Sequence, residues 1–180
     1  MTTLARTEGI VGIRAGAQAF VSAFAQRVET GLLAGAAQRR NRYVVTRRGS
    51  DAVAFRAMDW LTAFNVGLND VEITTASEGK VRYTIQYRRW AAYVLLFGVA
   101  FALVLGALPI FFDLRGYIER NAVSRMPGLS IDQNVTIFWV MVVFWGFAWP
   151  WIMIGLHKKP LRRLMESIIA EVDAGSTTSR

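Results

Sequence analysis

Two stretches without a charged residue decide the class of fold: 90–112, WAAYVLLFGVAFALVLGALPIFF, and 135–156, VTIFWVMVVFWGFAWPWIMIGL. At about 1.5 Å of rise per residue, each is about 33 Å long as an α-helix, which matches a bilayer hydrocarbon core of roughly 30 Å. A soluble domain of this size has too little other mass to surround two such helices. The sequence therefore predicts a transmembrane hairpin with helices at 90–112 and 135–156 and an outer loop at 113–134.

The overall composition is typical of a chain divided between membrane and water. Of the 180 residues, 53% are hydrophobic and 19% are charged, and the formal net charge is +8. A disordered chain is poorer in apolar residues. The chain has no cysteine and one histidine, His157, which excludes disulfide scaffolds, iron–sulfur clusters and multi-histidine metal sites within one chain.

The basic residues that flank the two stretches predict the orientation. Arg88 and Arg89 precede the first stretch, and Lys158 and Lys159 follow the second, whereas the arginines of the 113–134 loop are balanced by acidic residues. Lysine and arginine are retained on the cytoplasmic side of short-looped membrane proteins. We therefore expect an integral protein of the bacterial inner membrane with both termini in the cytoplasm.

Residues 1–89 form the largest polar region, and its patterns predict a small α+β cytoplasmic domain of order α-β-β-α-β-β. Apolar residues recur at helical spacing from Ile13 to Ala37, which predicts an amphipathic helix that covers a sheet or lies on the membrane surface. Alternating residues then predict strands at 43–46, 52–56, 71–75 and 81–87. Between the second and third strands, Asp59 is expected to cap a short helix.

The last segment, 157–180, predicts an amphipathic helix followed by a tail. Leu161, Met165, Ile168 and Val172 fall on one apolar stripe, and Gly175 is expected to end the helix. In the preceding apolar stretch, Pro150 predicts a bend.

Small residues in the first apolar stretch predict a helix–helix contact. Gly98, Ala102 and Gly106 are four residues apart, so they line one side of a helix and allow another helix to approach closely. The simplest partner is the second stretch of the same hairpin.

The second stretch is unusually aromatic. Side chains there can fill grooves of a neighbouring membrane protein, stack on a pigment or quinone, or face lipid. The candidate contact residues are Phe138, Phe144, Trp145, Phe147, Trp149 and Trp151.

Basic residues predict contact with anionic phospholipid headgroups or with an acidic protein partner. In a membrane protein this interpretation is favoured over nucleic-acid binding, because basic residues near the inner leaflet are attracted to its anionic lipids. The candidate residues are Arg39, Arg40, Arg42, Arg47, Arg48, Arg88, Arg89, Lys158, Lys159, Arg162 and Arg163.

Catalytic and transport chemistry find little support in the sequence. Neither apolar stretch contains an ionisable residue, which argues against a transporter or a proton pump. His157 has neighbouring aromatic residues and is a candidate ligand for a haem or pigment metal, but its place beside Lys158 favours a structural role at the end of the stretch. Asp70 and Glu72 are the remaining candidates for acid–base work. We expect no enzyme activity and predict no cofactor.

These observations favour a non-catalytic accessory or scaffold subunit that packs against other integral subunits of a larger membrane complex. A photosynthetic or respiratory complex is one setting in which the aromatic stretch would meet pigments or quinones. The alternative is a homo-oligomer that binds anionic lipid or shapes the membrane, with its amphipathic helices in the headgroup layer.

Overall fold

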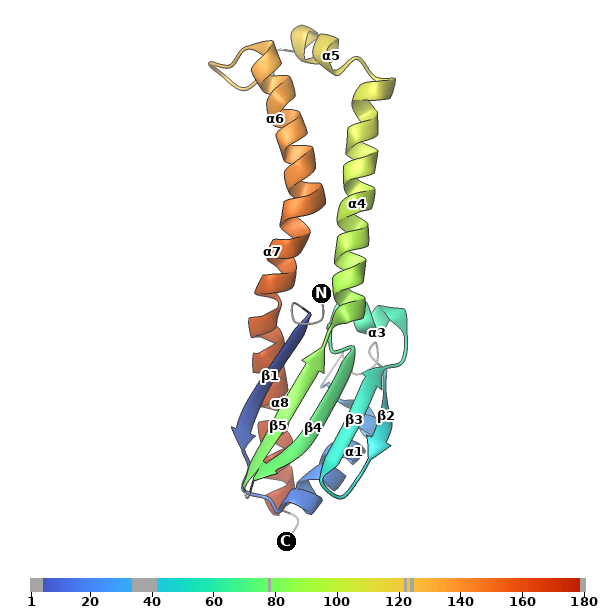
Figure 1. The fold of residues 1–180 in the computed structure, drawn as a ribbon, viewed down its shortest axis with the longest axis vertical. Helices are drawn as coiled ribbons and strands as arrows, with labels where there is room; N and C mark the ends of the chain where they lie inside the picture. The colour runs from blue at the N-terminus through green and yellow to red at the C-terminus, as the bar shows by residue number, and fades with distance from the viewer. Residues whose placement is uncertain (1–4, 34–41, 78, 122, 124, 179–180) are drawn as a thin grey trace. The chain divides into compact units, whose positions relative to one another are not determined.

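The computed structural model describes residues 5–33, 42–77, 79–121, 123 and 125–178 of the chain, which has a mixed α+β fold (Figure 1). The chain divides into two compact units. The first, here the sheet unit, contains residues 1–91 and 156–180. The second, here the hairpin unit, contains residues 92–155.

A five-stranded antiparallel sheet forms the centre of the sheet unit. Its strand order is β1-β5-β4-β3-β2, so β2 to β5 form a meander and β1 pairs with β5 at the edge (Figure 1). The strands are β1 (Arg6–Gly12), β2 (Tyr43–Arg48), β3 (Ala52–Ala57), β4 (Asp70–Ser77) and β5 (Lys80–Gln86). Alternate residues such as Val53, Ile73 and Tyr83 are fully buried on one face, as expected for a sheet covered on one side.

Two helices from opposite ends of the chain cover that face. The first, α1 (Ala17–Gly31), buries Phe20, Phe24 and Val28, and the ring of Phe24 stacks on Phe55 of β3. The second, α8 (Lys158–Thr178), lies over β1 and contacts α1 (Figure 1). Its apolar stripe is buried and consists of Leu161, Met165, Ile168, Ile169 and Val172. The segment after the second apolar stretch therefore completes the core of the sheet unit.

The beginning of the chain differs from the sequence-based expectation. The pattern predicted a helix from Ile13 and no strand before it, whereas residues 6–12 form β1 and α1 begins at Ala17. Because β1 is an edge strand with Ile10 exposed and glycines at 9 and 12, it lacks the alternation that marks a strand. Gly9 is required here, because a Cβ at this position would overlap the ring of Tyr83 on β5.

The end of α8 also differs, since the helix continues through Gly175 to Thr178. At this end the Ser176 hydroxyl donates to the carbonyl of Val172 at 2.7 Å.

A short helix, α3 (Trp60–Asn65), connects β3 to β4 and begins where the sequence predicted. The Asp59 carboxylate accepts from the backbone N–H of Thr62 at 2.7 Å, and this bond is the main reason that the pKa of Asp59 is lowered. Leu68, which follows the helix, is fully buried, but Leu61 and Phe64 are exposed. The helix therefore contributes little of its own apolar surface to the core.

Two helices are long and apolar enough, by length and composition, to cross a membrane. The first is α4 (Arg88–Phe111), and the second is a continuous helix that includes α6 (Ile131–Val143), the short π-helix η2 (Phe144–Ala148) and α7 (Trp149–Leu156). Between them lies α5 (Leu114–Arg120), which Asp113 caps. Ser130 and Gln133 form a capping box at the start of α6.

The π-helix has a cause in the sequence. Pro150 has no backbone N–H and cannot bond to the carbonyl of Gly146, four residues earlier. The N–H of Trp149 instead reaches back five residues to the carbonyl of Phe144. Just before Pro150, the hydrogen bonds of the helix thus change from a four-residue to a five-residue spacing.

Candidate functional site

The two apolar helices of the hairpin unit approach each other through small residues. Gly98 of α4 lies against Pro150 and Gly146, and the carbonyl oxygen of Gly146 is 2.7 Å from the position that a Cβ of residue 98 would occupy. Only the hydrogen of a glycine fits in that direction, so the backbones of the two helices approach closely at Gly98 and Gly146. Ala102 packs directly on Gly146.

Gly106 is packed more loosely than Gly98. A Cβ there would find its nearest neighbours in the side chains of Trp139, at 3.7 Å, and Val142, at 4.0 Å, which are ordinary contact distances. The structure thus places all three predicted small residues toward the second helix, with backbone-to-backbone approach at the Gly98 end.

Apart from this small-residue face, the hairpin unit exposes many large apolar side chains on both helices. On α4, Phe97 is 72% exposed and Leu103 is 68% exposed. On the second helix, Val143 and Phe147 are exposed by more than half. Monomeric proteins in water rarely expose contiguous apolar patches of more than a few hundred Å².

The six aromatic residues predicted as contacts have three kinds of surroundings in the structure. The rings of Phe144, Trp145 and Trp149 contact one another, with centroids 5.0–6.2 Å apart. Phe147 and Trp151 are exposed, and Phe138 is half-buried beside Trp139. The second helix therefore presents a preassembled group of rings together with two rings that stand apart.

In the sheet unit, the start of the first apolar segment and the end of the second both lie at one end of the sheet. Register pairs join Arg6, Gln86, Asp70 and Arg56 across β1, β5, β4 and β3. This row crosses the strands at one of their two ends. We call this end of the sheet the exit edge, because α4 begins two residues after Gln86, at Arg88.

Three rings meet at the exit edge. The indole of Trp90 stacks on the imidazole of His157, with ring centroids 3.8 Å apart and planes 6° from parallel. Tyr87 lies edge-on to both rings. Burial raises the pKa of Tyr87 to about 12. This ring cluster joins the first turn of α4 to the residue between α7 and α8.

The structure leaves no room for a metal ion at Nε2 of His157. This atom is buried without a hydrogen-bond partner in the described part of the chain, and it lies so close to Gly67 that a Cβ there would overlap it. Gly67 has φ +81°, a conformation that L side chains rarely adopt. Burial lowers the pKa of His157, and the nearby backbone of Val66 opposes this effect in part.

Asn69 and Arg89 complete the hydrogen bonding around the rings. The fully buried amide of Asn69 donates to the carbonyl of Ala63 and accepts from the N–H of Trp90, at 2.9 and 2.8 Å. The guanidinium of Arg89 donates to the backbone carbonyls of Ala57 and Asn69. Arg89 is therefore a structural residue of the exit edge, a role that its place before an apolar stretch did not reveal.

The predicted basic residues do not form a single patch. Arg39 and Arg40 lie outside the described residues. Arg42 is at the exit edge and pairs with Asp59, whereas Arg47 and Arg48, at the other end of β2, pair with Glu72 and Glu29. Arg88 and Arg89 lie at the exit edge, at the start of α4. Lys158 and Lys159 are in the first turn of α8, where Lys158 lines a pocket with Arg6 of the exit edge, and Arg162 and Arg163 follow one turn later.

The carboxylates considered for acid–base chemistry lie on the open face of the sheet. Asp70 is 3.8 Å from Arg89 and Glu72 is 3.5 Å from Arg47, and all four side chains are at least one-third exposed. Opposite charges in water-accessible positions form ordinary surface ion pairs. Within the described ranges, no group of three or more His, Asp or Glu residues is arranged to hold a metal ion.

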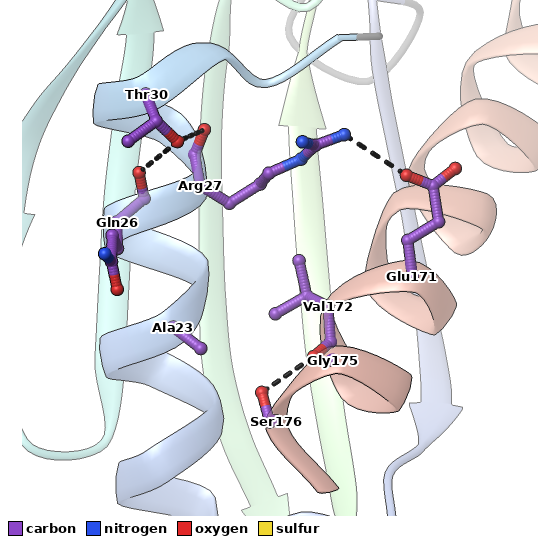
Figure 2. A pocket seen from close by; sticks show the side chains of 8 residues that line it. All are labelled: Ala23, Gln26, Arg27, Thr30, Glu171, Val172, Gly175 and Ser176. Atoms are coloured by element: carbon purple, nitrogen blue, oxygen red, sulfur yellow. Dashed lines mark hydrogen bonds and ion pairs between the residues drawn. The ribbon is translucent and has the colours of Figure 1, made fainter. Parts of the chain in front are cut away.

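A groove of about 460 Å³ runs between α1 and α8 (Figure 2). Arg27 of α1 and Glu171 of α8 point toward each other across it and pair at 3.3 Å. The hydroxyls of Thr30 and Ser176 donate to carbonyls of their own helices. These contacts make the groove a polar seam between two packed helices.

Asp173 is a structural residue that the sequence patterns did not reveal. Its buried carboxylate accepts hydrogen bonds from the backbone N–H groups of Arg14 and Ala15, at 2.9–3.0 Å. These groups lie just before α1, so Asp173 fixes the entry to α1 from the last turns of α8. A lone acid on an otherwise apolar stripe was the available signal.

Comparison with protein-family models, with curated proteins and with solved structures finds no match to this chain.

Proposed function

We propose that this protein is an integral membrane protein whose two apolar helices cross the bilayer, and that it serves as a non-catalytic accessory or scaffold subunit of a larger membrane complex. The observation that carries the proposal is the outer surface of the hairpin unit. The helices contact each other through Gly98, Ala102 and Gly146, while large apolar side chains point away from this contact. Such a surface is stable in lipid or against other membrane helices.

The exposed aromatic residues favour a protein partner within the membrane. Phe147 and Trp151 stand out beside the Phe144, Trp145 and Trp149 ring group, and large rings of this kind dominate the energetics of interfaces. With the basic residues of the exit edge on the cytoplasmic side, the sheet unit would face the cytoplasm of a bacterial cell.

Purification of the tagged protein in mild detergent tests this proposal, with mass spectrometry of co-purifying chains and an absorption spectrum of the same fraction. We expect a stable set of integral membrane subunits. The variant Phe147→Ala should reduce their recovery, and Leu103→Ala, which removes an even more exposed apolar side chain from α4, is the matched control. A partner-free homo-oligomer would contradict the subunit proposal.

The second candidate function is a homo-oligomer that binds anionic lipid, and the basic residues at the exit edge favour it. Arg88 and Lys159 are exposed beside the points where the apolar segments begin and end. Under this alternative, Arg88→Glu with Lys159→Glu should abolish the enrichment of anionic phospholipid in the purified fraction. Under the subunit proposal, the same changes should alter the recovery of partners.

A further inference from the structure

The short helix α3 carries an apolar surface that the sheet unit does not cover. Met58 is 62% exposed, Trp60 is 67% exposed and Leu61 is 44% exposed. We call these three residues the α3 surface. Phe64, on the same helix, is also 44% exposed. These residues lie together on a six-residue helix and just before it. Single apolar residues scattered over a surface are normal, whereas such a cluster is not.

The α3 surface lies at the exit edge. β3 and β5 run in the same direction, because each is antiparallel to β4, and their ends fall in one register row through Arg56, Asp70 and Gln86. The chain passes from β3 into Met58 and α3 at this row, and from β5 into α4. α3 and the first turn of α4 therefore leave the sheet from the same edge.

Two contacts tie the α3 connection to the ends of the apolar segments. Asn69 links Ala63 of α3 to the N–H of Trp90, the first residue of the 90–112 segment. Gly67 lies against His157, the residue that follows the 135–156 segment. Within the sheet unit, α3 is thus held at the level where both apolar segments begin and end.

That level is the headgroup region if the two segments cross a bilayer. Tryptophan is enriched at this depth, because its ring is apolar and its N–H remains hydrogen-bonded. The charge around α3 also suits this environment: Arg42 is highly exposed, and Arg88 and Lys158 lie at the same edge. The nearby Asp59 is engaged by the N–H of Thr62 and by Arg42.

We propose that the α3 surface inserts into the boundary between headgroups and acyl chains of the same membrane. This inference rests on the proposed membrane insertion of the two apolar helices. Its consequence is a third point of attachment, which holds the exit edge at the membrane surface and restricts the orientations that the sheet unit presents to a partner.

Site-specific labelling tests the proposal cleanly, because the chain has no cysteine. Trp60→Cys and, separately, Met58→Cys in the full-length protein would carry an environment-sensitive fluorophore in vesicles of phosphatidylcholine and phosphatidylglycerol. Nitroxide lipids with the quencher near the headgroup end of the acyl chain, or near its methyl end, report depth. Ser50→Cys, exposed in the turn at the opposite edge of the sheet, is the matched control, and Leu103→Cys on α4 reports insertion of the hairpin.

We expect shallow quenchers to reduce the fluorescence at positions 58 and 60 by about twofold or more and to leave position 50 unchanged, while Leu103→Cys responds to lipid quenchers. Quenching at position 103 without quenching at 58 and 60 would overturn the inference on α3 and leave the membrane helices in place. Absence of quenching at position 103 would overturn the membrane proposal, and the α3 inference with it.

Discussion

The indole of Trp90 lies flat on the imidazole of His157, with centroids 3.8 Å apart and an angle of 6° between the planes. Trp90 belongs to the first turn of α4, and His157 separates α7 from α8. Because the His157 ring also lies against Gly67, the start of one apolar segment and the end of the other are both fixed to the α3–β4 connection.

Replacement of Gly67 by alanine tests this arrangement. Gly67→Ala should lower the free energy of unfolding by about 2–4 kcal/mol, because the backbone has φ +81° and the new Cβ overlaps Nε2 of His157. Thermal unfolding in mild detergent measures the effect.

Gly79→Ala is the matched control for this change. Gly79 also has a positive φ, +69°, but a Cβ there would meet only the carbonyl of Ile13, at 3.5 Å. The control should show the backbone cost alone, about 1 kcal/mol. Equal losses in the two variants would show that the His157 contact contributes nothing.

His157 should also make stability depend on pH. Burial lowers its pKa in the folded protein below the ordinary value of 6.5, so the unfolded chain takes up a proton more readily. The contribution of His157 to stability is complete above pH 6.5 and is lost as the pH falls through its lowered pKa in the folded state. Unfolding of the wild type and His157→Phe, measured from pH 8 to pH 5, should show a steeper loss in the wild type.

The variant His157→Phe keeps a flat ring beside Trp90 and removes the titrating group, so the carboxylates of the chain contribute equally to both curves. Parallel curves for the two proteins would contradict the proposed role of His157. The comparison therefore separates a titration at this site from a general effect of acid.

The sequence patterns predicted most helices and strands of this fold but not how they combine. The stripe through Leu161, Met165 and Val172 indicated that one face of a helix is buried, yet a stripe carries no information on which surface covers it. That surface proved to be the sheet formed by the first half of the chain. β1 escaped prediction because Ile10 is exposed and Gly9 makes room for Tyr83, which are features of the tertiary structure.

The candidate sites show the same division between local and tertiary information. The spacing of Gly98, Ala102 and Gly106 is a local signal, and the structure places these residues toward the second helix. By contrast, the place of His157 beside Lys158 predicted a structural role at the end of the stretch but did not reveal that its ring stacks on Trp90 and lies against Gly67. Only folding of the α3–β4 connection creates that contact.

Asp173 should be more important for stability than its position near the end of the chain suggests. Asp173→Ala removes the acceptor for the N–H groups of Arg14 and Ala15 and should cost about 1–3 kcal/mol, because the Arg14 bond is part-buried and the Ala15 bond is buried. Amide hydrogen exchange at residues 14 and 15 should become faster in the variant.

Glu171→Ala is the matched control on the same helix. Glu171 forms an exposed ion pair with Arg27 at 3.3 Å, and loss of such a pair costs about 0–1 kcal/mol. If the two variants were equally stable, the carboxylate of Asp173 would not be the group that fixes the entry to α1.

The contact between the two apolar helices yields the last prediction. Gly98→Ala places a methyl group against Pro150 and the carbonyl of Gly146, where backbone atoms cannot move aside easily, and should destabilise the hairpin by about 1–3 kcal/mol. Gly106→Ala is the matched control, because its Cβ would meet Trp139 and Val142 at ordinary contact distances. Since alanine is favoured over glycine within a helix by about 1 kcal/mol, the control should be neutral or slightly stabilising. Thermal unfolding of both variants in the same mild detergent distinguishes the two effects. A Gly98→Ala protein as stable as Gly106→Ala would show that the helices do not approach through their backbones at Gly98 and Gly146.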